Sequence, residues 1–180
     1  GAGRLTREFF TKEVPSADEV KALRKHVKKT LETELAHLLD SKFDHAVATS
    51  KTFRQLARIG GAAPSSEGQR VQRELTLEDL NDWVPRISEM NYAQRAQLPG
   101  ISVGRAEQLL AGAIVAQETM EFLKLDTLEI CPWALREGMV SADPTLKLNA
   151  AKQALRVPKT LTEAQVEALL AAPDTSTALG

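Results

Sequence analysis

The residues with the clearest potential for chemistry lie where a short apolar segment gives way to a helix. Residues 45–49 are small and mostly apolar, as in a buried strand, and residues 50–59 have helical spacing before Gly60 and Gly61. A helix N-terminus offers free N–H groups and a partial positive charge to an anion. Hydroxyl and basic side chains surround this junction: Thr49, Ser50, Lys51, Thr52 and Arg54. The pattern predicts a phosphate-binding turn.

A simpler interpretation explains the same junction without a ligand. Ser50 or Thr49 can serve only as the helix N-cap, and Lys51 can be an ordinary solvated lysine. From these residues alone, both interpretations stay open with equal weight.

A second motif lies at residues 98–109, which resemble a helix-hairpin-helix turn. The loop amides of such a turn hold a DNA phosphate. Ser102 stands where that motif usually carries a second glycine, and the helix expected before the turn, around residues 92–97, is short. We therefore favour a plain Pro99–Gly100 turn that leads into a helix capped by Ser102.

Other chemical sites find little support in the sequence. The basic run 21–29 is flanked by acidic residues on both sides, which is typical of a solvated helix face. The three histidines and Cys131 have no metal-binding spacing, and the Gly-rich phosphate loops GxxxxGK[ST] and GxGxxG are absent from the sequence. We assign no metal ligands from these residues.

The elements that must position the phosphate-binding turn follow from hydrophobic spacing and capping signals. Helices are expected at 16–38, with Ser16 and Glu19 as a capping box, at 50–59, at 76–90 with a kink or early end at Pro85, and at 102–123. Strands are expected at 45–49 and 127–132, and residues 62–73 form a loop. The chain is predicted to be helix-rich α/β.

Length and composition set further limits. The chain has 180 residues, 43% hydrophobic and 26% charged, which indicates one globular domain with or without an appended piece. A net charge of -1 argues against general attraction to nucleic acid or acidic membranes. A single cysteine suits the cytoplasm, and no apolar run is long enough for a membrane span. The first residues do not read as a signal peptide but as the middle of a protein.

The composition changes after residue 140. Residues 141–158 form a polar connector, and a short helix is expected to open at Thr162 and to end at Pro173, after a helical turn at 135–140. This short helix has few apolar residues, and their burial cannot offset the entropy cost of ordering the connector. We therefore expect residues 141–180 not to share the core of residues 1–140.

Residues 1–140 resemble the exopolyphosphatase / guanosine pentaphosphate phosphohydrolase family, and in particular its actinobacterial branch. The resemblance rests on four motifs that occur in the same order. They are Gly1-Ala-Gly-Arg-Leu-Thr-Arg-Glu8, Ala46-Val-Ala-Thr-Ser-Lys-Thr-Phe-Arg54, Arg105-Ala106 with Leu110-Ala-Gly-Ala-Ile-Val115, and Ile130-Cys-Pro-Trp-Ala-Leu-Arg-Glu-Gly138. The resemblance implies an incomplete second domain of the actin-like, ribonuclease-H-like ATPase fold.

The resemblance also implies a function. The family hydrolyses polyphosphate or the 5′ phosphate of guanosine pentaphosphate with a divalent cation, expected to be Mg²⁺. Its phosphate loops and catalytic Glu precede the segment that begins at Gly1, so the chain is expected to bind no metal and to be inactive alone. The phosphate-binding residues carried over are Thr49, Ser50, Lys51, Thr52, Arg54 and Arg4. Arg105 and Gly112 match positions that we interpret as architecture.

Residues 141–180 depart from that family and resemble the interdomain linker and first catalytic-domain helix of Xer-type tyrosine recombinases. The resemblance lies in Ala142-Asp-Pro-Thr-Leu-Lys147 and in residues 157–174. The chain is therefore expected to join two incomplete pieces, 1–140 and 141–180, as a fragment or chimera.

Three functions compete at this point. The first is a bacterial phosphohydrolase fragment whose partners are polyphosphate or guanosine pentaphosphate, with a homodimer also considered and no membrane. The second is a DNA-binding or recombination module that uses the 98–109 turn and the C-terminal piece, although the near-neutral charge makes nucleic acid an unfavoured partner. The third is a helical interaction domain, which the ordered motifs disfavour.

Overall fold

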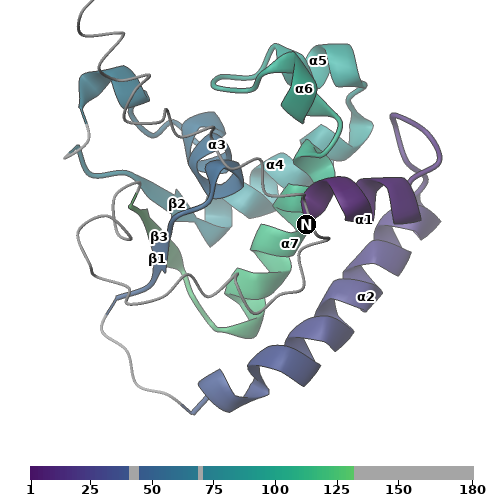
Figure 1. The fold of residues 1–180 in the computed structure, drawn as a ribbon, viewed down its shortest axis with the longest axis horizontal. Helices are drawn as coiled ribbons and strands as arrows, with labels where there is room; N and C mark the ends of the chain where they lie inside the picture. Colours follow the sequence, from purple (N-terminus) through teal and green to yellow (C-terminus); the bar gives the residue numbers. More distant parts are fainter. Residues whose placement is uncertain (41–44, 69–70, 132–180) are drawn as a thin grey trace, which may run out of the picture. The chain divides into compact units, whose positions relative to one another are not determined.

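The computed structural model describes residues 1–40, 45–68 and 71–131 (Figure 1). Its backbone contacts divide the chain into two units, Gly1–Val140 and Ser141–Gly180. The expected helical turn at 135–140, the connector at 141–158 and the helix at 162–173 lie outside the described residues.

A small mixed sheet forms one side of the described unit. Its strands are β1 (Val47–Ala48), β2 (Glu74–Thr76) and β3 (Thr127–Ile130), in the order β1-β3-β2. β1 runs parallel to β3 with Val47 opposite Glu129, and β2 runs antiparallel to β3 with Leu75 opposite Leu128. The two expected strands are confirmed at smaller extent, whereas β2 was not expected and lies between the loop expected at 62–73 and the helix expected from Thr76.

Helices make up most of the described residues, as expected for a helix-rich α/β chain. They are α1 (Ala2–Phe9), α2 (Ala17–Leu35), α3 (Lys51–Ile59), α4 (Leu77–Glu89), α5 (Tyr92–Ala96), α6 (Val103–Ala106) and α7 (Leu109–Phe122). Short 3-10 turns lie at Ala36–Leu38 and Ser65–Glu67.

Local capping signals fix where α2 and α4 begin. Ser16 and Glu19 form the expected capping box of α2, and Thr76 with Asp79 does the same for α4. Hydrogen bonds from the backbone N–H of Ser16 and from the side chain and backbone of Thr11 lower the pKa of Glu19 to about 2. The carboxylate is therefore charged at neutral pH and accepts bonds at the positive end of α2.

One expectation about helix continuity is wrong, and one of the two alternatives for Pro85, an early end of the helix, is ruled out. The expected long helix at 102–123 is two helices, α6 and α7, with a turn at Glu107 and Gln108, and the Ser102 side chain makes no capping bond. α6 packs with α5, whereas α7 packs among α1, α2 and α4, so the chain changes direction between them. Pro85 does not shorten α4, which continues to Glu89.

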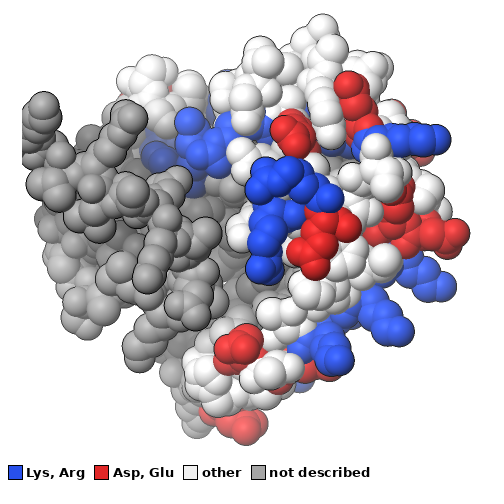
Figure 2. Space-filling model, turned by 45° about the vertical axis from the view of Figure 1, so that its right-hand side comes forward, with Lys and Arg blue, Asp and Glu red and all other residues white. Residues whose placement is uncertain are grey.

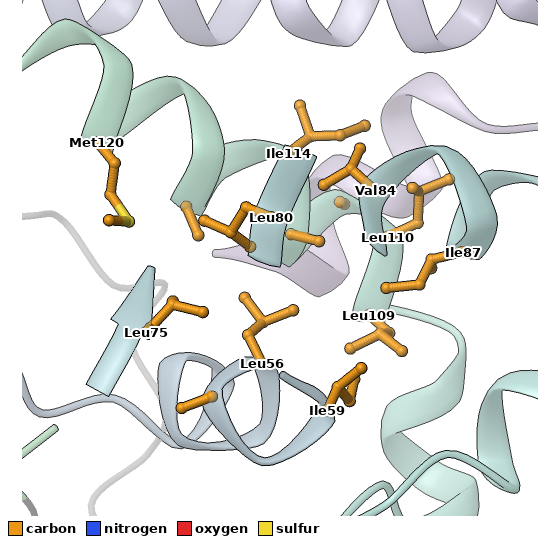
Figure 3. Packing of buried hydrophobic residues seen from close by; sticks show 14 of the residues in the cluster. Leu56, Ile59, Leu75, Leu80, Val84, Ile87, Leu109, Leu110, Ile114 and Met120 are labelled. Carbon is orange, nitrogen blue, oxygen red and sulfur yellow. The ribbon is translucent and has the colours of Figure 1, made fainter. Parts of the chain in front are cut away.

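The core is built around α7. This helix is buried on nearly all sides, and Figure 1 shows it between α2 and the sheet, with α1, α3 and α4 beside it. Leu80 and Val84 of α4 meet Leu110 and Ile114 of α7 in the interior (Figure 3). Gly112 lets α7 approach α3, because a Cβ there would lie 2.6 Å from Cγ2 of Thr52.

One buried ion pair ties α2 to α7. Arg24 pairs with Glu118 and donates a 2.7 Å hydrogen bond to the side chain of Gln117. Lys28 lies 3.4 Å from the second oxygen of Glu118, whose side chain is 1% exposed. A carboxylate buried to this degree requires such cationic partners. Within the described part of the chain, no helix is both long and apolar enough to cross a membrane.

Candidate functional site

The candidate site is organised by α3, whose first residue is fixed by a serine cap. Ser50 has extended backbone angles, and its Oγ accepts a 3.2 Å hydrogen bond from the backbone N–H of Phe53. The Ser50 carbonyl accepts a second bond from the N–H of Arg54. The Ser50 side chain thus has the capping role that the sequence left open.

The two faces of α3 are different in character. Leu56 and Ile59 point from the helix into the core, toward Leu75 of β2 and the side chains of α4 and α7 (Figure 3). The neighbouring face carries the cations Lys51, Arg54 and Arg58 together with Gln55, at the i, i+3, i+7 and i+4 positions that lie on one side of a helix. This cationic stripe extends over about 10 Å of helix.

A cavity of about 400 Å³ lies against this stripe, within the size range of small-ligand sites. We call it the α3 cavity. Its cationic lining residues are Lys51, Arg54, Arg58 and Arg73, and no lining residue in the described part of the chain is acidic. Gln55, Gly100 and residues 63–65 complete the wall.

The Pro99–Gly100 turn packs against α3 and closes one side of the α3 cavity. Gln55 donates a 3.1 Å hydrogen bond from Nε2 to the carbonyl of Gly100. Gly100 has φ +77, and a Cβ there would lie 2.9 Å from Cγ of Arg58, so a side chain would be strained and crowded. The turn that resembled a DNA-binding hairpin therefore presents its glycine carbonyl to α3.

Two arginines of the lining donate hydrogen bonds to backbone carbonyls. Arg73, which is 8% exposed, donates from Nε to Ala63, from Nη1 to Val71, and from Nη2 to Pro64 and Gly68, at 2.6–3.0 Å. Arg58 donates from Nη1 to the carbonyl of Ala62 at 2.8 Å. These bonds satisfy donors but leave both positive charges in place.

Among the described residues, no carboxylate compensates the charge of the α3 cavity. Across the described residues, no carboxylate oxygen lies within 4.0 Å of the basic nitrogens of Lys51, Arg54, Arg58 or Arg73. The Nε atom of Arg54 is buried and has no hydrogen-bond partner among the same residues. Four cations beside a low-dielectric wall create a positive potential that attracts an anion, and a buried donor without a partner gains most from one.

The structure brings together only two of the six residues predicted to bind phosphate. Lys51 and Arg54 line the α3 cavity. Thr49 and Ser50 line a separate cavity of about 410 Å³, whose other walls are mostly apolar side chains beside β1. Thr52 packs toward Gly112 of α7, and Arg4 of α1 lies 3.9 Å from Glu8 with its side chain 71% exposed.

Sequence reasoning missed Arg58 and Arg73 as lining residues. The position of Arg58 was readable, because it continues the Lys51 and Arg54 spacing by one more turn. Arg73 reaches the site only because the chain after α3 folds back to β2. No local sequence pattern predicts that Arg73 lies at the α3 cavity.

The exposed cations of α2 have a different environment. On the face drawn in Figure 2, Lys and Arg side chains are interspersed with Asp and Glu, without a broad area of one charge. Lys28 pairs with Glu118, and Lys21 and Lys25 stand exposed on the helix. This surface fits the solvated face expected for the basic run 21–29.

The described residues do not fit a divalent-metal site. Among residues 1–40, 45–68 and 71–131, no three His, Cys, Asp or Glu side chains converge closely enough to hold an ion. We therefore derive no chemical step through Mg²⁺.

Comparison with known proteins gives two similarities. Residues 1–145 match the Ppx/GppA phosphatase family. Exopolyphosphatase 1 of Mycobacterium leprae is 48% identical over 141 residues, which are 78% of this chain and 42% of that protein. The chain thus spans about two fifths of the length of such relatives. Tyrosine recombinase XerD of Ralstonia nicotianae is 71% identical over 110 residues, which are 61% of this chain and 33% of that protein. Both family resemblances noted in the sequence are confirmed, but the recombinase match of 110 residues is longer than the segment 141–180 to which we assigned it.

A solved structure supports the fold. The Ppx/GppA family member of Aquifex aeolicus superposes with a TM-score of 0.64 at 26% identity, over 84% of this chain and 48% of that one. The expected fold class, helix-rich α/β of the actin-like kind, is confirmed by this similarity.

Proposed function

This chain belongs to the Ppx/GppA phosphatase family, and from that membership we propose that it serves the hydrolysis of phosphoanhydride bonds in polyphosphate or guanosine pentaphosphate. Its contribution in this proposal is to bind phosphate groups of the substrate through Lys51 and Arg54. In this proposal a longer anion also lies near the other residues predicted from the sequence, which are Thr49, Ser50, Thr52 and Arg4. Ser50 acts mainly as the helix cap.

The observation that carries this proposal is the α3 cavity with four cations and no acidic lining residue among those described. Polyphosphate is a polyanion, and cations on the wall of a cavity attract it more strongly than cations on an open helix, where water and salt screen them. The helix N-terminus at Lys51 adds its partial positive charge to the same end of the cavity.

Hydrolysis needs more than binding. Attack on a phosphoryl group requires neutralisation of developing charge and a placed base for the water. The described residues offer no group of ligands for Mg²⁺. We therefore propose that the chain alone binds the substrate without turnover. Phosphate release from long-chain polyphosphate with Mg²⁺ should equal that of a heat-inactivated control, and turnover that survives repurification would contradict this.

Titration with long-chain polyphosphate tests the binding proposal. Lys51→Ala/Arg54→Ala should weaken binding at least about tenfold, because each charge-assisted contact contributes about 1.5–3 kcal/mol. The matched control is Lys21→Ala/Lys25→Ala, which removes the same charge from the exposed face of α2 and spares Lys28, the partner of Glu118. Equal losses in the two double variants would reject the assignment to α3.

DNA binding is a second candidate, favoured by the similarity to a tyrosine recombinase. Duplex DNA at the same concentration of phosphate groups provides the comparison. This alternative requires DNA to bind at least as tightly as polyphosphate and to be insensitive to Lys51→Ala/Arg54→Ala. The phosphohydrolase proposal requires weak DNA binding that falls steeply with salt.

A further inference from the structure

Arg58 and Arg73 belong to the same cavity as Lys51 and Arg54 but come from outside the α3 N-terminus. We propose that the α3 cavity is a subsite for one phosphoryl group, and that these two arginines form part of its wall. This inference rests on the proposed function and extends it: the ligand enters the cavity instead of lying only across the first turn of α3.

The hydrogen bonds of the three arginines indicate that each has a different role in the cavity. Arg73 uses Nε and both terminal nitrogens on four backbone carbonyls, so it supplies a fixed charge and holds the wall. Arg58 donates a hydrogen bond from Nη1 to the carbonyl of Ala62 and has further N–H donors that can bind an anion. Arg54 lines the cavity, and its Nε is buried without a partner among the described residues, so its terminal guanidinium nitrogens are the donors that it offers to a phosphoryl oxygen.

The burial of Arg73 is a separate observation that favours an anion. Its carbonyl partners carry no net charge, and an enclosed cation with no carboxylate among the described residues is costly. A doubly charged phosphoryl group in the cavity provides the missing counter-charge. Orthophosphate and the end of a phosphate chain share this chemistry.

Ser65 allows the cavity to be tested without touching any of the four cations. It lies on the wall and is exposed, and its neighbour Ser66 is also exposed but does not line the cavity. Ser65→Asp places a carboxylate beside the proposed phosphoryl group, whereas Ser66→Asp makes the same change of charge one residue away. Both variants lie in a short exposed 3-10 turn, where folding tolerates them.

The experiment titrates the full chain and its variants with orthophosphate and, separately, with tripolyphosphate. Ser65→Asp should weaken binding at least about tenfold through like-charge repulsion, and Ser66→Asp should stay within about twofold because solvent screens its charge. Arg58→Gln should also weaken binding. The rise in melting temperature that the ligand causes should disappear in Ser65→Asp and persist in Ser66→Asp.

The outcomes separate this inference from the proposed function. Equal affinities of Ser65→Asp and Ser66→Asp, or no binding of either phosphate form by the parent chain, would overturn the subsite. If Lys51→Ala/Arg54→Ala still weakens the binding of long-chain polyphosphate in that case, the proposed function stands. If it does not, the subsite and the proposed function both fail. Binding of orthophosphate identifies a site for the free ion, and binding of tripolyphosphate alone identifies a site for the end of a chain.

Discussion

Gly112 holds the first turn of α3 against α7, and replacing it with alanine should push that turn away. The added Cβ would lie 2.6 Å from Cγ2 of Thr52, far inside the 3.5–4.0 Å of a normal carbon contact. Crowding of this kind costs about 1–3 kcal/mol in a packed core. Better helix propensity returns about 1 kcal/mol, so the net destabilisation of Gly112→Ala should be about 0–2 kcal/mol.

A matched control isolates the contact. Gly104 lies in α6 with no atom within 4 Å of the position that a Cβ would take. Gly104→Ala gains propensity without crowding, so its free energy of unfolding should exceed that of Gly112→Ala by about 1–3 kcal/mol. Urea unfolding measures both, and Thr52→Ser, which removes Cγ2, should recover much of the loss only in the Gly112→Ala background.

The same displacement should reach the α3 cavity. Moving the first turn of α3 carries Lys51 with it, so Gly112→Ala should weaken polyphosphate binding and Gly104→Ala should not. Equal stability of the two glycine variants, or a Thr52→Ser change that helps neither, would refute the claim that this contact positions α3.

Two further predictions concern α2. The pKa of Glu19 is lowered from 4.5 to about 2, so its hydrogen bonds stabilise the fold above pH 4.5 and this stabilisation is lost as the pH falls toward 2. The difference in melting temperature between the parent chain and Glu19→Gln should therefore shrink over that interval. A difference that stays constant would contradict this prediction. Arg24→Met leaves the buried Glu118 with Lys28 as its one remaining ion-pair partner among the described residues, so it should lower the free energy of unfolding in urea by less than the cost of a buried charge with no partner, which is about 3–5 kcal/mol. Arg24→Met/Glu118→Leu should be more stable than Arg24→Met, and the reverse order would count against a buried ion pair.

What the sequence predicted well was local. The capping box of Ser16 and Glu19 and the stop of α3 at Gly60 each involve residues within a few positions, and the structure contains them, while the cap at Ser50 was one of two interpretations that the sequence left open. The strand at β3 followed from its apolar run, and the family resemblance from ordered motifs. Short-range hydrogen bonds and turn preferences decide such features, so no knowledge of the fold is needed.

What the sequence missed depends on distant contacts. β2 has only three residues and exists through its pairing with β3, which lies more than fifty residues further on. The break between α6 and α7 arises because the two helices pack against different partners. Arg73 becomes part of the α3 cavity by the same non-local route, and Thr52 does not line that cavity because its methyl group faces Gly112. Local propensity carries none of this information.

The most direct test of the central claim compares lysine reactivity in the unmodified chain. Acetylation of each lysine is followed by mass spectrometry with and without long-chain polyphosphate, at a salt concentration that screens exposed charges. Lys51, in the α3 cavity, should be protected, while the exposed Lys21 and Lys25 of α2 should react at unchanged rates. Protection of the α2 lysines with Lys51 still fully reactive would contradict phosphate binding at α3.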